Sequence, residues 1–255
     1  MPLDIEQVRA LRPANEIHYF SVIGSTMTQA SCLVAAGAPH GAVVVADEQS
    51  AGIGRLGRHW ISEPGVGIYC SVLLRLSLPP AKLPVASLVA GLAVAEAIHK
   101  STELACDLRW PNDVLIRERK TAGILTQLTD DCVIAGIGIN VNNTQFPDGL
   151  RTPPTSLLLS SYGKRHSREG LLIQLLASLE GFSNTLVREG SEPILRAFTA
   201  ASSYAANRRV IVEESGARGI TAGLDEHGFL LLRTDEGLTQ RVSSGGVRPE
   251  SMVRT

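Results

Sequence analysis

The 255-residue chain lacks most of the features that mark a specialised class of protein. Its four cysteines form no C-x-x-C pair, so a disulfide framework or a cysteine zinc site is not expected, and we predict reduced, mostly buried thiols. A formal net charge of −1 does not indicate the basic surface that nucleic-acid binding requires. No signal peptide is evident, and the longest apolar run, residues 83–95, is too short to span a bilayer. We therefore expect a cytoplasmic protein with neither DNA nor membrane partners.

Several catalytic motifs are missing as well. The chain has no G-x-x-x-x-G-K-[ST] phosphate loop, no H-E-x-x-H zinc motif and no G-x-S-x-G nucleophile turn, and its six histidines are scattered. Gly52, Gly54 and Gly57 spell G-x-G-x-x-G, but the next residues run into Pro64-Gly65 and cannot begin a helix. A nicotinamide dinucleotide site is therefore disfavoured.

Hydrophobic periodicity and turn residues predict an α+β domain followed by a small all-β domain. Helices are expected over residues 26–36, 82–100, 167–188 and 192–202, and strands over 42–46, 69–76, 108–110, 114–116, 123–128 and 133–141. After residue 206 come four short strands, at 209–212, 219–222, 229–232 and 239–242. The predicted domains are 1–206 and 207–255.

Arginine and glycine are concentrated between residues 52 and 60. The guanidinium of Arg55 suits bidentate bonds to phosphate oxygens, and the glycines let a loop approach a ligand closely. A mobile loop that closes over a phosphate-containing ligand is one interpretation. A solvated surface loop with incidental charges is the other, and the loop alone does not decide between them.

A carboxylate and a lysine flank a short hairpin further along the chain. Asp113 follows Trp110-Pro111-Asn112 and is a reasonable Mg²⁺ ligand, because Mg²⁺ takes one or two carboxylates together with phosphates. Lys120 begins the next strand, where its charge would offset the repulsion between a substrate carboxylate and an α-phosphate. An exposed hairpin with a solvated lysine explains the spacing equally well.

Glycines also interrupt the apolar strand at 133–141. Gly136 and Gly138 indicate close approach by a ligand, and Asn140 is a polar side chain in an apolar run that needs a partner. A metal or a phosphate would serve as that partner, and so would a protein group at a β-bulge.

Together these segments resemble, in order and spacing from about residue 18 to 250, the biotin–protein ligases. Ser25-Thr26-Met27 resembles the family's S-T-N segment, and Gln49 to Trp60 resembles its Q-x-x-G-R-G-R-x-G-R-x-W loop. Arg109 to Leu125 resembles K-W-P-N-D…K-x-x-G-I-L, Gly136 to Asn142 resembles G-I-G-x-N-V-N, and Thr155-Ser156-Leu157 resembles T-S-L.

The resemblance implies a mixed β-sheet catalytic domain with flanking helices, of the class II synthetase-like or biotin–lipoate ligase fold, plus a small C-terminal SH3-like β-barrel. It implies that biotin and MgATP form biotinyl-5′-AMP and pyrophosphate, after which a lysine of a biotin carboxyl carrier domain displaces AMP.

The resemblance also implies roles for individual residues. Lys120 and Arg55 would be catalytic. The biotin site would contain Ser25, Thr26, Met27, Gln49, Gly52, Gly54, Arg55, Lys120, Gly123, Gly136 and Gly138. ATP or the adenylate would contact Arg55, Arg58, Trp60, Asn112, Lys120 and Asn140, and Mg²⁺ would contact Asp113 and Asn140.

Some positions depart from the family pattern. Met27 replaces the usual Asn, and Ile53 and Leu56 stand where the loop usually carries Arg or Lys, which implies weaker retention of the adenylate. About seventeen residues precede the catalytic segment, so we expect no N-terminal DNA-binding domain and no repressor role. The chain is expected to act on a carboxylase carrier domain, as a monomer or homodimer.

Three rival functions remain at this stage. A lipoate or octanoate–protein ligase would share the catalytic fold, although the Arg55–Trp60 loop and the predicted barrel favour biotin. A non-catalytic ligand sensor is disfavoured by Asp113 and Lys120, and a nucleotide-dependent dehydrogenase is the weakest alternative.

Overall fold

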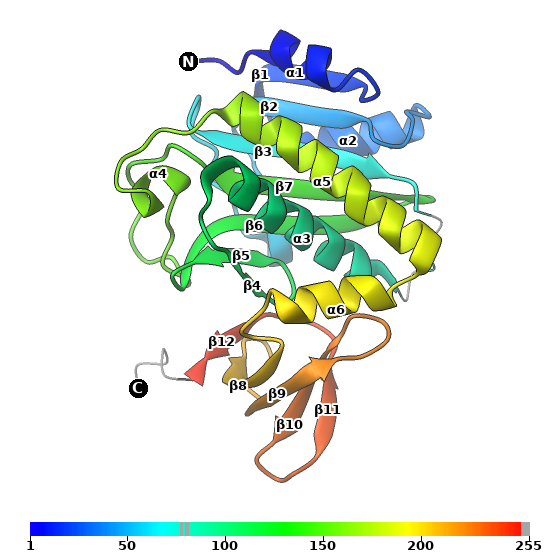
Figure 1. The fold of residues 1–255 in the computed structure, drawn as a ribbon, viewed down its shortest axis with the longest axis vertical. Coiled ribbons are helices and arrows are strands. Elements are labelled where there is room, and N and C mark those ends of the chain that lie inside the picture. Colours follow the sequence, from blue (N-terminus) through cyan, green and yellow to red (C-terminus); the bar gives the residue numbers. More distant parts are fainter. Residues whose placement is uncertain (77–78, 80–81, 251–255) are drawn as a thin grey trace.

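The structure, a computed structural model, describes residues 1–76, 79 and 82–250, and its larger domain is built on a seven-stranded sheet (Figure 1). The strands are β1 (Ile17–Ile23), β2 (Val43–Gln49), β3 (Gly67–Leu74), β4 (Asp107–Arg109), β5 (Asp113–Ile116), β6 (Arg119–Thr129) and β7 (Cys132–Asn140). Their order is β1-β2-β3-β7-β6-β5-β4, with β1 and β2 parallel and the other neighbours antiparallel. The predicted mixed sheet is confirmed.

Six helices pack around this sheet in the described part of the chain. They are α1 (Ile5–Leu11), α2 (Thr26–Ala35), α3 (Leu83–Thr102), α4 (Leu157–Ser160), α5 (Arg168–Glu189) and α6 (Glu192–Ala200). The long helices α3 and α5 lie side by side on one face, whereas α2 lies on the other (Figure 1). The predicted helices are therefore present, with ends that differ by at most two residues.

The sheet has a different core on each face because successive side chains of a strand point to opposite sides. On β7, Ile137 and Ile139 belong to the large core under α3 and α5, whereas Cys132 and Ile134 belong to a small core under α2. Helix α2 has only ten residues, so it covers part of its face. Beyond its N-terminal end the strands carry glycines, which leaves space above the sheet.

The C-terminal part of the chain forms a separate five-stranded antiparallel sheet. Its strands are β8 (Ala206–Val212), β9 (Arg218–Leu224), β10 (Leu230–Thr234), β11 (Thr239–Val242) and β12 (Val247–Pro249), in the order β11-β10-β9-β8-β12. β8 begins at the position expected for the domain boundary. Whether this sheet closes into an SH3-like barrel stays a prediction. The domain limits 1–206 and 207–255 also stay predictions, and residues 251–255 lie outside the described residues.

The two sheets are joined by specific contacts. The buried Trp110 donates from Nε1 to the carbonyl of Gly228, 3.0 Å away. The hydroxyl of Tyr204 donates to Glu118, on the turn between β5 and β6, and Arg208 pairs with the same carboxylate at 2.9 Å. The β5–β6 turn of the seven-stranded sheet is therefore anchored to the C-terminal domain.

Five elements were not predicted: α1, β1, the short 3-10 helix η1 (Arg55–Gly57), α4 and β12. β1 is an edge strand that is only half buried, so polar residues such as His18 and Ser21 interrupt its apolar pattern. α4 and β12 have four and three residues, which is too short for a periodic signal. These elements owe their conformation to tertiary contacts rather than to local pattern.

Helices α3 and α5 are long and apolar enough to cross a membrane by length and composition alone. In the protein, 67% of the apolar window of α3 is buried, which is typical of a core helix, and 44% of that of α5 is buried. All four cysteines are free; Cys70 and Cys132 are buried and Cys106 is half-buried, but Cys32 is exposed because it lies on the outer side of α2. The expectation of buried thiols is wrong for Cys32.

Candidate active site

Three glycines form the floor of the site on the α2 face of the sheet. Gly123 on β6 lies opposite Gly138 on β7, and Gly136 is two residues earlier on the same face. A Cβ on Gly138 would collide with the indole of Trp60, and a Cβ on Gly136 would meet Sδ of Met27 at 2.5 Å. Glycine is required here because other side chains sit directly against the strand backbone.

The N-terminal end of α2 forms one wall. The backbone N–H and the hydroxyl of Thr26 both donate to Oε1 of Gln49, at 2.8 and 3.0 Å, and Ser71 donates to the Thr26 hydroxyl at 2.9 Å. Gln49 in turn donates to Ser62 at 2.9 Å. This buried chain of bonds fixes the start of the helix, so the wall is preorganised.

A small cavity of about 50 Å³ lies between this wall and the glycine floor, with room for only a few water molecules. Its lining contains most of the predicted biotin residues: Thr26, Met27, Gln49, Gly54, Arg55, Lys120, Gly123, Gly136 and Gly138. Ser25 and Gly52 are buried just behind the lining rather than in it. The Ser25 hydroxyl has no hydrogen-bond partner in the described residues.

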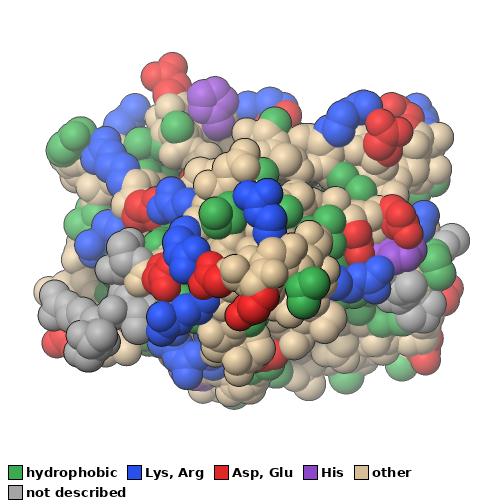
Figure 2. Space-filling view, turned by 90° about the horizontal axis from the view of Figure 1, so that it is seen from below, with side chains coloured by type: hydrophobic (Ala, Val, Ile, Leu, Met, Phe, Trp, Pro, Cys, Tyr) green, Lys and Arg blue, Asp and Glu red, His purple; other side chains and the backbone are tan. Residues whose placement is uncertain are grey.

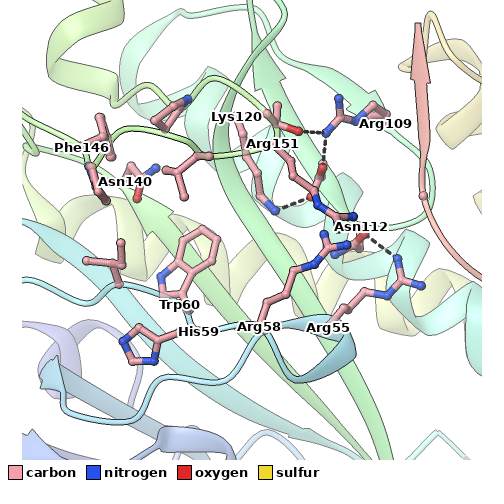
Figure 3. A pocket seen from close by; sticks show the side chains of 18 of the residues that line it. Arg55, Arg58, His59, Trp60, Arg109, Asn112, Lys120, Asn140, Phe146 and Arg151 are labelled. Carbon is pink, nitrogen blue, oxygen red and sulfur yellow. Dashed lines mark hydrogen bonds and ion pairs between the residues drawn. The ribbon is translucent and has the colours of Figure 1, made fainter. Parts of the chain in front are cut away.

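A second cavity, of about 490 Å³, opens next to the first one. All six predicted nucleotide residues line it: Arg55, Arg58, Trp60, Asn112, Lys120 and Asn140 (Figure 3). The loop at 142–155 supplies an apolar wall that includes Phe146 and Leu150. Five Lys or Arg side chains and three carboxylates line the cavity, so it carries an excess of positive charge suited to an anionic ligand.

Trp60 lines both cavities, and its indole is labelled among the residues of the larger one in Figure 3. Its indole ring covers Gly123 and Gly138, and Nζ of Lys120 lies 5.5 Å from the centroid of the ring. The Nε1–H of Trp60 is buried and has no acceptor in the described part of the chain. A buried donor without an acceptor is costly, which makes this polar group a candidate for ligand binding.

The carboxylate of Asp113 lies between two cations. Its Oδ1 is 2.6 Å from Nζ of Lys120, and its Oδ2 is 2.5 Å from a guanidinium nitrogen of Arg109, which also donates to Thr152 at 2.6 Å. Burial alone would raise the pKa of Asp113, but the charges of Lys120 and Arg109 outweigh burial and hold this pKa below its usual value. The side chain of Lys120 is thus fixed at the border of the two cavities.

Of the two Mg²⁺ ligands predicted from the sequence, Asn140 fits this geometry better than Asp113. Both oxygens of Asp113 are taken by cations, so the cluster has no net negative charge to attract a divalent ion. Asn140 donates from Nδ2 to the Thr155 carbonyl at 3.0 Å, which leaves its Oδ1 beside the larger cavity. The described residues hold no group of three His, Cys, Asp or Glu side chains suited to a metal. A magnesium site made by protein alone is therefore not supported.

Arg55 connects the glycine-arginine loop to both domains. Its Nη1 donates to Oδ1 of Asn112 at 3.0 Å and to the carbonyl of Gly245 at 3.1 Å. Asn112 is fixed because it donates to the Ile124 carbonyl at 2.9 Å. Burial lowers the pKa of Arg55, while nearby Asp113 opposes that shift. Arg55 thus fastens the loop that follows Gly52 to the site, although Ile53 and residues 56–59 of the loop are exposed.

Sequence reasoning missed several residues of the larger cavity. Glu213 comes from the C-terminal domain, and Arg151 and Phe146 come from the 142–155 loop, and none of the three was assigned a role from the sequence. Arg109 lay within a recognised motif but received no role. Nothing in the local sequence marks Glu213, because it reaches the site only through the packing of the two domains.

Comparison with known proteins agrees with this architecture. Residues 19–142 match the family model of the biotin/lipoate A/B protein ligase family, and residues 206–247 match that of the biotin protein ligase C-terminal domain. The catalytic fold and the two-cavity site thus define a member of the protein ligases that handle biotin or lipoate.

Individual relatives narrow this class. The bifunctional ligase/repressor BirA of Bacillus spizizenii is 38% identical over 89% of this chain and 72% of its own length. The biotin–[acetyl-CoA-carboxylase] ligase of Mycobacterium tuberculosis is 35% identical over 88% of this chain and 85% of its own. The biotin protein ligase of Aquifex aeolicus, solved with biotin and ATP, has a TM-score of 0.80 and 32% identity, covering 91% of this chain and 97% of its own. The chain belongs to the biotin protein ligases.

Proposed function

We propose that this chain is a biotin–[acetyl-CoA-carboxylase] ligase, which activates biotin with ATP and transfers it to a lysine of a carrier domain. The observation that carries the proposal is the pair of adjoining cavities. Five residues line both of them: Gly54, Arg55, Trp60, Asn112 and Lys120. A carboxylic acid in the smaller cavity and a nucleotide in the larger one would meet at this shared border.

In the first step, an oxygen of the biotin carboxylate attacks the α-phosphorus of ATP, and the bond to the β,γ-pyrophosphate breaks. Two anions must approach each other, so a cation between them lowers the barrier. Lys120 is suited to this role, because Asp113 and the border position hold its ammonium in place. Arg55 is suited to covering the adenylate from the loop side.

In the second step, the amine of an acceptor lysine attacks the carbonyl carbon of biotinyl-5′-AMP. The new amide bond forms as the bond to the AMP oxygen breaks, and the lysine loses a proton. The larger cavity is the side from which the acceptor would enter, because its volume of about 490 Å³ leaves room for a lysine side chain, whereas the smaller cavity has only about 50 Å³.

Mg²⁺ would enter with ATP and would neutralise charge on its phosphates. Phosphate oxygens would supply most of its ligands, since Mg²⁺ is commonly bound by substrate phosphates and few protein groups. Asn140 is the better placed of the two predicted protein ligands, and Asp113 fits poorly because it is already paired with two cations.

The proposed partner is a biotin carboxyl carrier domain of acetyl-CoA carboxylase or a related carboxylase. We expect no binding to DNA or membranes, and a monomer or a homodimer in the cytoplasm. On the face formed by the C-terminal domain, Lys and Arg side chains are interspersed with Asp and Glu rather than gathered in a basic patch (Figure 2). The four free cysteines suit a reducing compartment.

ATP–pyrophosphate exchange tests the proposal directly. The purified protein is given MgATP with biotin, lipoate or octanoate in parallel, and a carrier domain is then added to follow transfer. We expect exchange with biotin alone, followed by loss of free adenylate on addition of the carrier. Exchange with lipoate or octanoate instead would move the chain to the sister ligases, and exchange with none of the acids would refute the adenylation step.

A further inference from the structure

One carboxylate of the C-terminal domain faces the larger cavity and is surrounded by arginines. Glu213 follows β8, and its side chain is 10% exposed. Its carboxylate lies 3.6 Å from Arg58, 4.0 Å from Arg151 and 3.1 Å from Arg248. Its backbone N–H donates to the carbonyl of Gly246 at 2.8 Å, so the position of the residue is fixed from its own domain.

Two of these arginines belong to different loops of the catalytic domain. Arg58 is on the glycine-arginine loop and Arg151 is on the 142–155 loop, and both line the larger cavity (Figure 3). Within the described residues, Glu213 is the one carboxylate closer than about 4 Å to either guanidinium. Without Glu213, the neighbouring guanidinium groups of Arg58 and Arg151, whose side chains are exposed, would repel each other toward solvent.

A guanidinium has five N–H donors, so an arginine can bond a carboxylate along one edge and a phosphate along another. An arginine held in place before a ligand arrives also loses less conformational freedom on binding. Arg55 adds a second link between the same loop and the same part of the C-terminal domain, because it donates to the Gly245 carbonyl.

We propose that Glu213 is a positioning residue of the nucleotide site, which holds Arg58 and Arg151 in the larger cavity so that they can bind the phosphates of ATP. This proposal rests on the proposed function only because it names ATP as the anion that the arginines bind. The C-terminal domain thereby completes the nucleotide site of the catalytic domain.

The test is Glu213→Gln, which keeps the size of the side chain and removes its charge. The affinity for MgATP is measured by titration calorimetry, and the KM values for ATP and biotin are measured by pyrophosphate exchange. Because exposed ion pairs are weak, we expect ATP affinity to fall by about three- to tenfold, with the KM for ATP rising equally. The kcat and the KM for biotin should stay within about twofold of the wild-type values.

Glu250→Gln is the matched control. Glu250 is also a partly buried glutamate of the C-terminal domain, and it pairs with Arg209 and with Arg218, on β8 and β9 rather than at the cavity. We expect no change in ATP affinity. A second check is Arg58→Gln: in that background, Glu213→Gln should have a smaller effect than in the wild type, because it acts partly through Arg58.

Unchanged or tighter ATP binding in Glu213→Gln would overturn the proposal, and so would an equal loss in the control. A loss of kcat with no change in the KM for ATP would assign Glu213 a different role. If the wild-type protein bound ATP but showed no exchange with biotin, the proposed function would fail, while the calorimetry would still decide the role of Glu213.

Discussion

Gly138→Ala adds one methyl group where the structure has no room for it. The three atoms nearest to the added Cβ all belong to the indole of Trp60, well inside van der Waals contact. Overpacking of this kind costs about 1–3 kcal/mol. Trp60 is half-buried on a loop, so its ring can move aside and the sheet can keep its register.

The methyl group also projects toward the space between the two cavities, where we place the carboxylate end of biotin. Since about 1.4 kcal/mol corresponds to a tenfold change in affinity, the KM for biotin should rise by roughly five- to a hundredfold. The KM for ATP should change less, because most of the larger cavity lies away from Gly138. Pyrophosphate exchange at varied biotin and at varied ATP separates the two effects.

Gly181→Ala is the matched control. Gly181 lies on the exposed side of α5, and a Cβ there would meet nothing within 4 Å. Replacing glycine by alanine within a helix should stabilise the protein by up to about 1 kcal/mol without changing either KM. A normal KM for biotin in Gly138→Ala, with the Tm lowered by less than about 5 °C, would show that biotin does not pass over Gly138.

Three further changes test other parts of the site. Lys120→Ala should lower the kcat of biotin-dependent exchange by about a hundred- to a thousandfold while far-UV circular dichroism stays native, and retained exchange would remove the assigned role. Arg55→Gly should release biotinyl-5′-AMP and label bystander lysines, which mass spectrometry of a mixed protein pool detects; unchanged acceptor selectivity would count against the loop as a cover. Asp113 has a lowered pKa in the folded state, so its stabilising contribution should be full above its unfolded pKa of about 3.9 and lost as the pH falls through the folded value. Denaturant titrations of the wild type and Asp113→Asn should therefore converge in acid, and a constant difference down to pH 2 would contradict this assignment.

Much of the catalytic sheet was predictable because its strands are buried on both faces. β7 is apolar throughout except for Gly136, Gly138 and Asn140, and those three exceptions mark the site. A glycine in a buried strand is informative because nothing about strand formation favours it. Lys120 was not decided by its spacing, which a solvated lysine of an exposed hairpin explained equally well, and its role came from the resemblance to the biotin–protein ligases.

The ion pairs of the site were not predictable. Arg109 and Asp113 are four residues apart on neighbouring strands, and their pairing depends on the turn between β4 and β5. Arg58 and Glu213 are joined only by the contact between two domains. Local sequence specifies the periodicity of an element, whereas such contacts depend on how elements pack. The sequence around a charged residue does not identify the residue with which it pairs.

The position of Trp60 has a consequence for how the two substrates come together. The proposed reaction requires the carboxylate and the α-phosphate to meet beside Lys120, yet the indole now lies between the two cavities at that point. Its buried Nε1–H has no acceptor, which costs the present arrangement about 1–3 kcal/mol and lowers the energy needed to change it. A ligand that displaced the ring would gain room over Gly123 and could offer that N–H an acceptor.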